Sequence, residues 1–217
     1  VILSPRAQGA WDTRKMKQQI SDGKAASRPG KMLILQALAH GGALLALVAL
    51  LVWLDASINA SAAPWKLFVA AAGAFVSGLA LSHIVHEWGH YFGAIGARSA
   101  VDIKAGIAPL FFDFDFSKNS SAQFLSRSLC GLAGNMLLLA VAVWWAASPS
   151  PVAISLLAAV LGQFVFVLIL ELPVSVGVLR GGDPWEVLGA HFGQGVPLFL
   201  GALVAGIAVA ALVLVGY

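Results

Sequence analysis

Five long apolar runs constrain the fold of this 217-residue chain more than any other feature of its sequence. The hydrocarbon core of a bilayer is about 30 Å thick, so a helix needs about 20 mostly apolar residues to cross it. The five runs have roughly that length or more, and they cover residues 32–54, 68–97, 125–147, 152–170 and 196–217. Only 11% of the residues are charged, whereas soluble domains carry about 25%, which excludes an ordinary soluble enzyme. The sequence therefore predicts an all-α polytopic membrane protein with five to six transmembrane helices.

The basic residues gather near the amino terminus and predict the orientation of the chain. Seven of the 13 Lys and Arg residues precede Met32. This bias is too local for a nucleic-acid-binding surface, so no nucleic-acid partner is expected, and it is typical of segments that stay in the cytoplasm. We interpret residues 1–31 as a cytoplasmic tail and residues 32–217 as the membrane domain. The connections with Lys104 and Arg180 are then cytoplasmic too, and we expect a multi-pass protein of a prokaryotic cytoplasmic membrane.

Two segments do not follow the pattern of a continuous transmembrane helix. Residues 99–116 alternate apolar and polar side chains and contain a glycine and a proline, which is typical of a β-hairpin. Residues 171–195 contain Pro173 and the pair Gly181 and Gly182, so we expect a broken helix there. Broken backbone at membrane depth is tolerated only against protein or a water-filled cavity. A functional site is therefore expected beside this broken segment.

The strongest chemical signal is the sequence His-Glu-Trp-Gly-His at residues 86–90. His86 and His90 are four residues apart, so on a helix they lie on one face and can share a Zn²⁺ ion. Glu87 lies between them, where its carboxylate can act as general base toward a metal-bound water. A chance cluster of polar residues at the membrane interface would not select this spacing. The motif therefore predicts one zinc ion per chain.

A catalytic zinc usually has three protein ligands and a water, so a further carboxylate is needed. Asp183 follows two glycines and precedes Pro184, and proline is a favoured first residue of a helix. We expect Asp183 to be the third ligand, carried by the broken helix on the cytoplasmic side. Two alternatives remain open: Asp183 only caps the helix, or Glu171 or Asp115 is the ligand instead.

These residues resemble the site-2 protease family, which are intramembrane zinc metalloproteases. Besides the HExxH motif, residues 130–138 (CGLAGNMLL) are similar to the family's AGPxxN stretch, with Asn135 on its asparagine and Leu132 in place of its proline. The segment before Asp183 resembles the family's proline-rich approach to a DG motif, which supplies the third ligand, although a proline follows the aspartate here. The resemblance covers about residues 68–190.

The resemblance implies that residues 32–217 form a transmembrane metalloprotease domain. It would hydrolyse a peptide bond of a membrane-protein or peptide substrate in or near the lipid bilayer, with Glu87 as the general base. Asn135 is then expected to bind the substrate backbone, although a hydrogen bond between helices would equally explain a polar residue there. The hairpin would offer an open strand edge to an unwound substrate. The alternative is a zinc-binding scaffold or a subunit of a larger membrane complex that does not cleave.

Overall fold

The computed structural model describes residues 29–58, 63–148 and 150–216. The described part contains six helices and one two-stranded sheet, in the order α2 (Pro29–Ser57), α3 (Pro64–Gly96), β1 (Val101–Ile103), β2 (Phe112–Phe114), α4 (Ser121–Ala146), α5 (Pro151–Leu179), α6 (Pro184–Phe192) and α7 (Val196–Val215). The tail predicted over residues 1–31 lies outside the described residues except at its end, where α2 begins.

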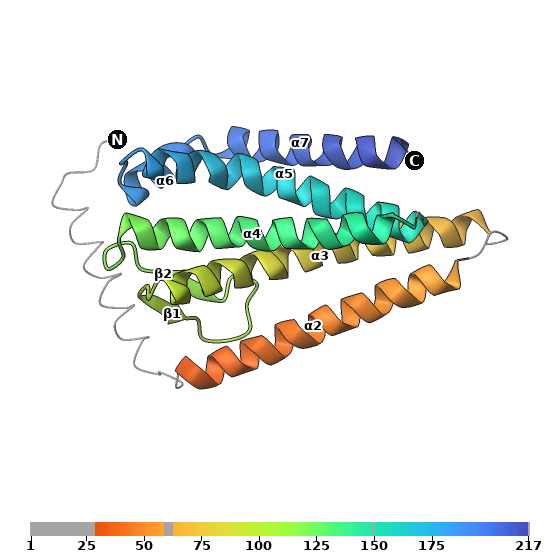
Figure 1. Cartoon of the computed structure of the whole chain (residues 1–217), viewed down its shortest axis with the longest axis horizontal. Helices are drawn as coiled ribbons and strands as arrows, with labels where there is room; N and C mark the ends of the chain where they lie inside the picture. The colour runs from red at the N-terminus through yellow and green to blue at the C-terminus, as the bar shows by residue number, and fades with distance from the viewer. Residues whose placement is uncertain (1–28, 59–62, 149, 217) are drawn as a thin grey trace, which may run out of the picture.

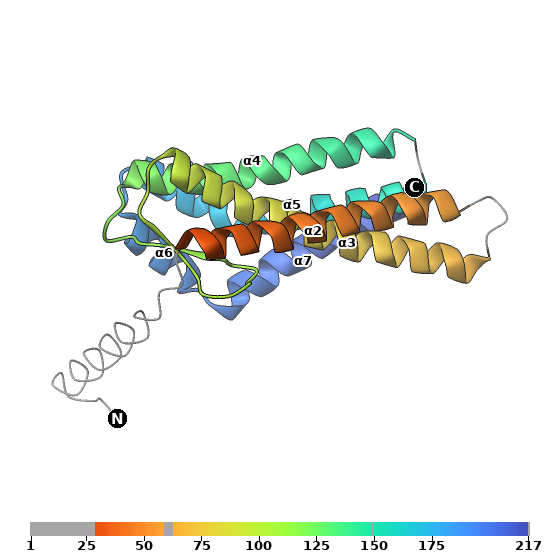
Figure 2. The same cartoon turned by 90° about the horizontal axis from the view of Figure 1, so that it is seen from below.

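Five of these helices, namely α2, α3, α4, α5 and α7, are long and apolar enough to cross a membrane. They run side by side along the long axis of the molecule, as Figure 1 shows. Seen from below, α4 and α7 lie on opposite sides of α5 (Figure 2). The prediction of an all-α polytopic chain is thus confirmed at the level of helix number, length and composition.

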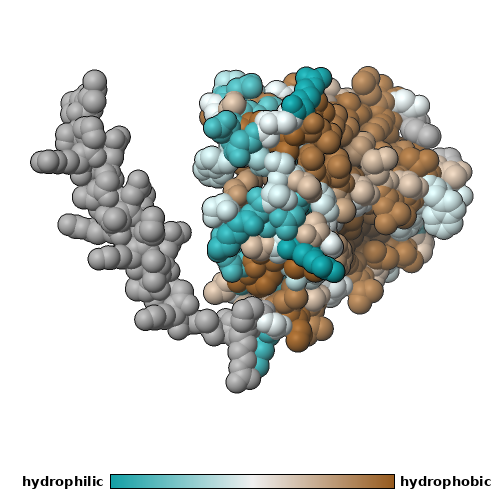
Figure 3. Space-filling view, turned by 60° about the vertical axis from the view of Figure 1, so that its left-hand side comes forward, coloured by the Kyte–Doolittle hydropathy of each residue, from teal (hydrophilic) through white to brown (hydrophobic). Residues whose placement is uncertain are grey.

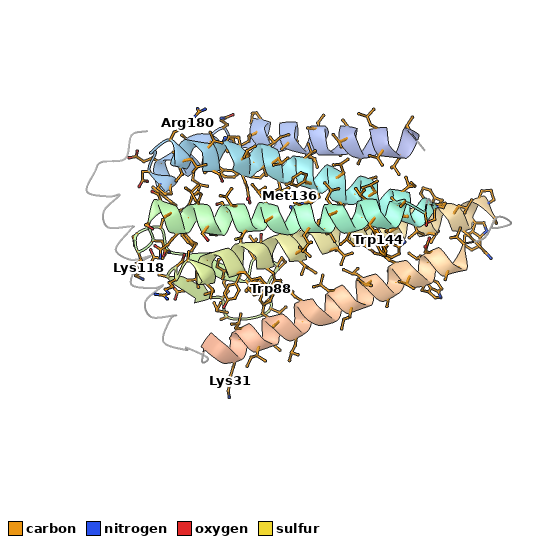
Figure 4. The ribbon with its side chains drawn as sticks, viewed as in Figure 1. Lys31, Trp88, Lys118, Met136, Trp144 and Arg180 are labelled. Atoms are coloured by element: carbon orange, nitrogen blue, oxygen red, sulfur yellow. The ribbon has the colours of Figure 1, made fainter. Side chains whose placement is uncertain are left out.

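The two ends of the helix bundle differ in polarity. The hairpin and the short helix α6 lie at the same end (Figure 1), and hydrophilic residues gather there while hydrophobic residues cover the flank (Figure 3). Figure 4 labels Lys118 and Arg180 at this end, and Trp144 toward the other end. An apolar flank with polar residues at the end is the surface expected of a bundle in a bilayer.

Short polar side chains define where the helices begin. Ser120 and Gln123 form a reciprocal capping box at the start of α4, which satisfies two backbone N–H groups that have no partner within the helix. At the start of α5, the Ser150 hydroxyl accepts a hydrogen bond from the Ala153 N–H and donates one to Asp55. The second contact joins the beginning of α5 to the end of α2.

Helix α5 differs from the sequence prediction over residues 171–179, because it continues without a break as far as Leu179. Pro173 lies inside this helix, where a proline removes one backbone hydrogen bond at a cost of about 3 kcal/mol. The buried side chains of Val174 and Val178 on the same stretch pack against the rest of the bundle and stabilise it. The helix is interrupted only after Leu179, near Gly181, whose φ of 95° is accessible to glycine.

The predicted hairpin is present as a small antiparallel sheet. Val101 pairs with Phe114, and Ile103 pairs with Phe112. The loop between the strands is attached to α2 through Gln36, whose amide donates to the carbonyl of Ala108 at 2.7 Å and accepts from its N–H at 3.1 Å. The hairpin is therefore held against the bundle at the level of the HExxH motif, since Phe111 of the same loop packs on Trp88.

Candidate metal centre

Helix α3 packs against both α4 and α5 and carries the histidine motif in its carboxyl-terminal half. His86, Glu87 and His90 are 5%, 8% and 2% exposed, and their ligand atoms all lie within 4.8 Å of one another. The two histidines lie together because residues four apart on a helix share one face, and Glu87 is the residue next to His86. These three residues could hold a metal ion.

Helix α5 brings Glu171 to the two histidines. Its Oε1 lies 3.0 Å from the Nε2 of His86 and 3.0 Å from the Nε2 of His90. Ligand atoms held about 2.0–2.1 Å from a tetrahedral zinc are about 3.3 Å apart, so both distances are close to what one shared ion would require. The second oxygen of Glu171, Oε2, is buried and has no hydrogen-bond partner among the described residues. Glu171 therefore stands where a third ligand is needed.

Hydrogen bonds on the far side of each imidazole orient the rings. The Nδ1 of His90 lies 3.0 Å from the carbonyl oxygen of Arg127, which can only accept, so this nitrogen carries the proton. The Nδ1 of His86 lies 3.3 Å from the amide of Asn135, a residue that is 1% exposed. A 180° rotation of that amide would turn its unpartnered Oδ1 toward a protonated Nδ1. In both neutral rings the lone pair of Nε2 then faces Glu171 and is free for a metal.

Glycines on α3 and α4 let the two helices approach closely beside the histidines. A Cβ atom at Gly131 would overlap the ring of His90, and one at Gly89 would lie 2.5 Å from the carbonyl oxygen of Cys130. At Gly93 a Cβ would overlap the carbonyl oxygen of Ser126. These glycines are not among the residues predicted for the site, although the four-residue spacing of Gly89 and Gly93 on α3 is typical of a close helix contact.

The two other candidate carboxylates are not brought to the histidines. Asp183 is exposed and caps α6, where it accepts hydrogen bonds from two backbone N–H groups at 2.9 and 3.1 Å. Asp115 lies in the loop after β2, where hydrogen bonds from Lys118 and Ser117 lower its pKa to about 2. The expectation that Asp183 is the third ligand therefore does not fit the geometry, and the alternative, Glu171, does.

No protein-family model matches the chain, and neither a curated protein nor a solved structure matches it significantly. The function must therefore be inferred from the residues of the site and their geometry.

Proposed function

We propose that the chain is an intramembrane zinc metalloendopeptidase, with His86, His90 and Glu171 as metal ligands and Glu87 as general base. The observation that carries the proposal is the position of one carboxylate oxygen of Glu171, 3.0 Å from the Nε2 atoms of both histidines. A half-buried carboxylate beside two buried imidazoles at this spacing, with a second carboxylate next to them, fits a metal centre better than a packing contact.

The donor set agrees with the chemistry proposed. Two imidazoles and one carboxylate are a set typical of hydrolytic zinc sites, which leave a fourth position for water. A bound zinc ion lowers the pKa of that water and polarises the carbonyl of the peptide bond. A structural site needs ligands but no base, so Glu87 at the centre favours catalysis.

The protein residues would transfer the proton and orient the metal ligands. Glu87 accepts the proton of the attacking water and returns it to the leaving nitrogen, so that the C–N bond is replaced by a C–O bond and the amine leaves neutral. Asn135 and the carbonyl of Arg127 hold the two imidazoles in the orientation and tautomer that a metal needs. Because the Asn135 side chain is buried against His86, we assign it this positioning role in place of binding the substrate backbone.

The charged surface at one end of the bundle and the open edge of the hairpin support an orientation in the membrane and a class of partner. Basic residues at the end that carries the hairpin favour a cytoplasmic position for this end and for the amino terminus. A membrane-embedded protein or peptide that unwinds near the site could pair with the edge of the hairpin, which satisfies its freed backbone groups. The expected location is a prokaryotic cytoplasmic membrane, where other membrane subunits are candidate partners.

The proposal is tested with purified full-length chain and its Glu87→Gln variant. We expect both proteins to bind one zinc ion, measured by mass spectrometry of the metal, because Glu87 is not among the three ligands. Membrane proteins that co-purify with Glu87→Gln but not with the unaltered chain are then candidate substrates, and each is incubated with both proteins. Cleavage by the unaltered chain alone supports the peptidase. Equal zinc with no cleavage of any trapped protein would favour a non-cleaving scaffold.

A further inference from the structure

Arg127 on α4 is a cation next to the metal centre that lacks a matching anion. Its Nε is buried and has no hydrogen-bond partner, and Arg127 forms no salt bridge within residues 29–58, 63–148 and 150–216. Its guanidinium lies 5.9 Å from the ring of Phe112 and 5.5 Å from the ring of Phe114, on the hairpin. The rings hold the group in place by cation–π attraction but do not neutralise its charge.

A cavity of about 250 Å³ opens between this arginine and Glu171. Among the residues that the structure describes, its polar lining residues are Arg127, Ser128 and Glu171, and the other walls are apolar side chains of α4, α5, α6 and the loop after β2. An apolar cavity with a few convergent polar groups is the usual form of a small binding site. Because Glu171 belongs both to the cavity and to the proposed ligand set, an occupant of the cavity lies beside the reacting centre.

The charges around the cavity call for one more negative group. In the proposed centre, the carboxylates of Glu87 and Glu171 offset a divalent cation, and Arg127 then leaves one positive charge unbalanced. An uncompensated charge at membrane depth is costly. The planar guanidinium fork matches a carboxylate with two parallel hydrogen bonds. A peptide can supply such a carboxylate either from an Asp or Glu side chain or from its own carboxyl terminus.

We propose that this cavity is a substrate subsite in which Arg127 binds a carboxylate of the peptide close to the bond that is cleaved. The proposal rests on the proposed function for the bound divalent metal, which sets the charge balance, and for the identity of the occupant as a peptide. Arg127 is then the residue that determines specificity, and the carbonyl of the same residue orients His90. The apolar walls would hold the side chain or chain end that carries the carboxylate.

The test measures binding of three fluorescent peptides to full-length Glu87→Gln protein in lipid nanodiscs, with empty nanodiscs as background. The peptides share one apolar sequence. The first has an internal Asp and an amidated terminus, the second has Asn and an amidated terminus, and the third has Asn and a free terminal carboxylate. We expect one carboxylate peptide to bind about 10- to 100-fold more tightly than the peptide without one, as charged hydrogen bonds do. The peptide that gains affinity identifies the source of the carboxylate.

Variants of Arg127 test whether this residue causes the tighter binding of a peptide that carries a carboxylate. Arg127→Gln should remove the difference and leave the affinity of the uncharged peptide unchanged, and Arg127→Lys should keep part of it. The matched control is Arg180→Gln, which changes an exposed arginine at the same end of the bundle outside the cavity. Equal affinity of all three peptides, no binding of either carboxylate peptide, or an equal loss for all three in Arg127→Gln would each overturn the subsite.

Cleavage by the chain with Glu87 intact is measured separately on the same peptides. Cleavage without a carboxylate preference would leave the peptidase and remove the subsite. A preference that depends on Arg127, without any cleavage, would leave the subsite and remove the peptidase.

Discussion

At the scale of single residues, the site depends on where the two imidazoles place their protons. A neutral histidine has one nitrogen with a proton and one with a free lone pair. The Arg127 carbonyl fixes the proton of His90 on Nδ1, and Asn135 does the same for His86 when its amide is rotated by 180° so that Oδ1 faces the ring. Both Nε2 atoms then face the Glu171 oxygen as acceptors at 3.0 Å, and acceptors so close repel one another unless a cation lies between them. In that arrangement, a metal ion bound by the three atoms would remove the repulsion.

Substitutions distinguish Glu171 from Asp183 as the third ligand through their effect on zinc binding. Loss of a hydrogen-bond partner behind a ligand weakens zinc binding about 10- to 100-fold. Glu171→Gln should weaken it by more than this, because a neutral amide is a poor zinc ligand. Asp183→Asn should leave zinc unchanged and alter stability by less than about 0.5 kcal/mol, because asparagine caps a helix as well as aspartate does. Zinc content and thermal unfolding of the purified variants measure both effects. If Asp183→Asn loses zinc and Glu171→Gln keeps it, Asp183 is the third ligand, as the sequence predicts.

Asn135 gives a second prediction at this scale. Asn135→Ala should weaken zinc binding about 10- to 100-fold, because His86 loses the partner that holds its ring. Competition with a chelator of known affinity measures the change. If Asn135 only contacts the substrate, the zinc affinity stays the same and the KM for a cleaved peptide rises. The matched control is Ser126→Ala, which removes a hydroxyl of α4 that donates to the carbonyl of Gly93 on α3, away from His86.

At the scale of elements, the position of His90 is set by how closely α4 approaches α3. Gly131 lies directly against the imidazole, and Gly89 lies against the backbone of α4. The HExxH motif thus uses its fourth residue, a glycine, for packing while its two histidines face the site. Helix α5 contributes by packing against α3, which brings Glu171, two residues before Pro173, to the histidines.

The element scale also explains which parts of the site follow from sequence. The pair His86 and His90 follows from helix geometry alone, so its spacing was sufficient. Glu171 could not be chosen over Asp183, because the predicted span ends at residue 170, one residue before it, and only the packing of α5 against α3 shows that Glu171 faces the two histidines. Asp183 was favoured because its neighbours suit a helix start, and capping proved to be its observed contact.

A methyl group at the closest helix contact should disturb the site. Gly131→Ala places a Cβ against the His90 ring, so the ring or α4 must move, and we expect about 1–3 kcal/mol of destabilisation together with weaker zinc binding. Gly41→Ala on α2 is the control, because a Cβ there meets no atom of the described residues within 4 Å. Thermal unfolding and zinc content are measured for both. An unchanged zinc content in Gly131→Ala would show that the His90 ring can shift without leaving the site.

At the scale of the whole molecule, the bundle places its chemistry near one end. The hairpin, α6 and the carboxyl-terminal half of α3 occupy the same end, and the basic residues Lys118 and Arg180 lie there as well (Figure 4). A metal centre that uses water must be reached from an aqueous phase, and a position near the bundle end shortens that path. For the proposed peptidase, the side of the membrane that this end faces decides which compartment supplies the water and receives the product.

The orientation of the bundle is the last prediction. The rule that basic loops stay in the cytoplasm places Lys118 and Arg180 inside, and Lys66, near the start of α3, outside. Single cysteines at these three positions, in a Cys130→Ser background, are treated in intact cells with a thiol reagent that does not cross the membrane. We expect labelling at position 66 in intact cells, and at 118 and 180 only after the membrane is opened. Lys118 forms an ion pair with Asp115 at 2.7 Å and Lys104 forms one with Asp113 at 3.1 Å, so a cysteine at position 104 gives a second, separate position in the same connection. Labelling of 104, 118 and 180 from outside would invert the topology and expose the metal centre to the opposite compartment.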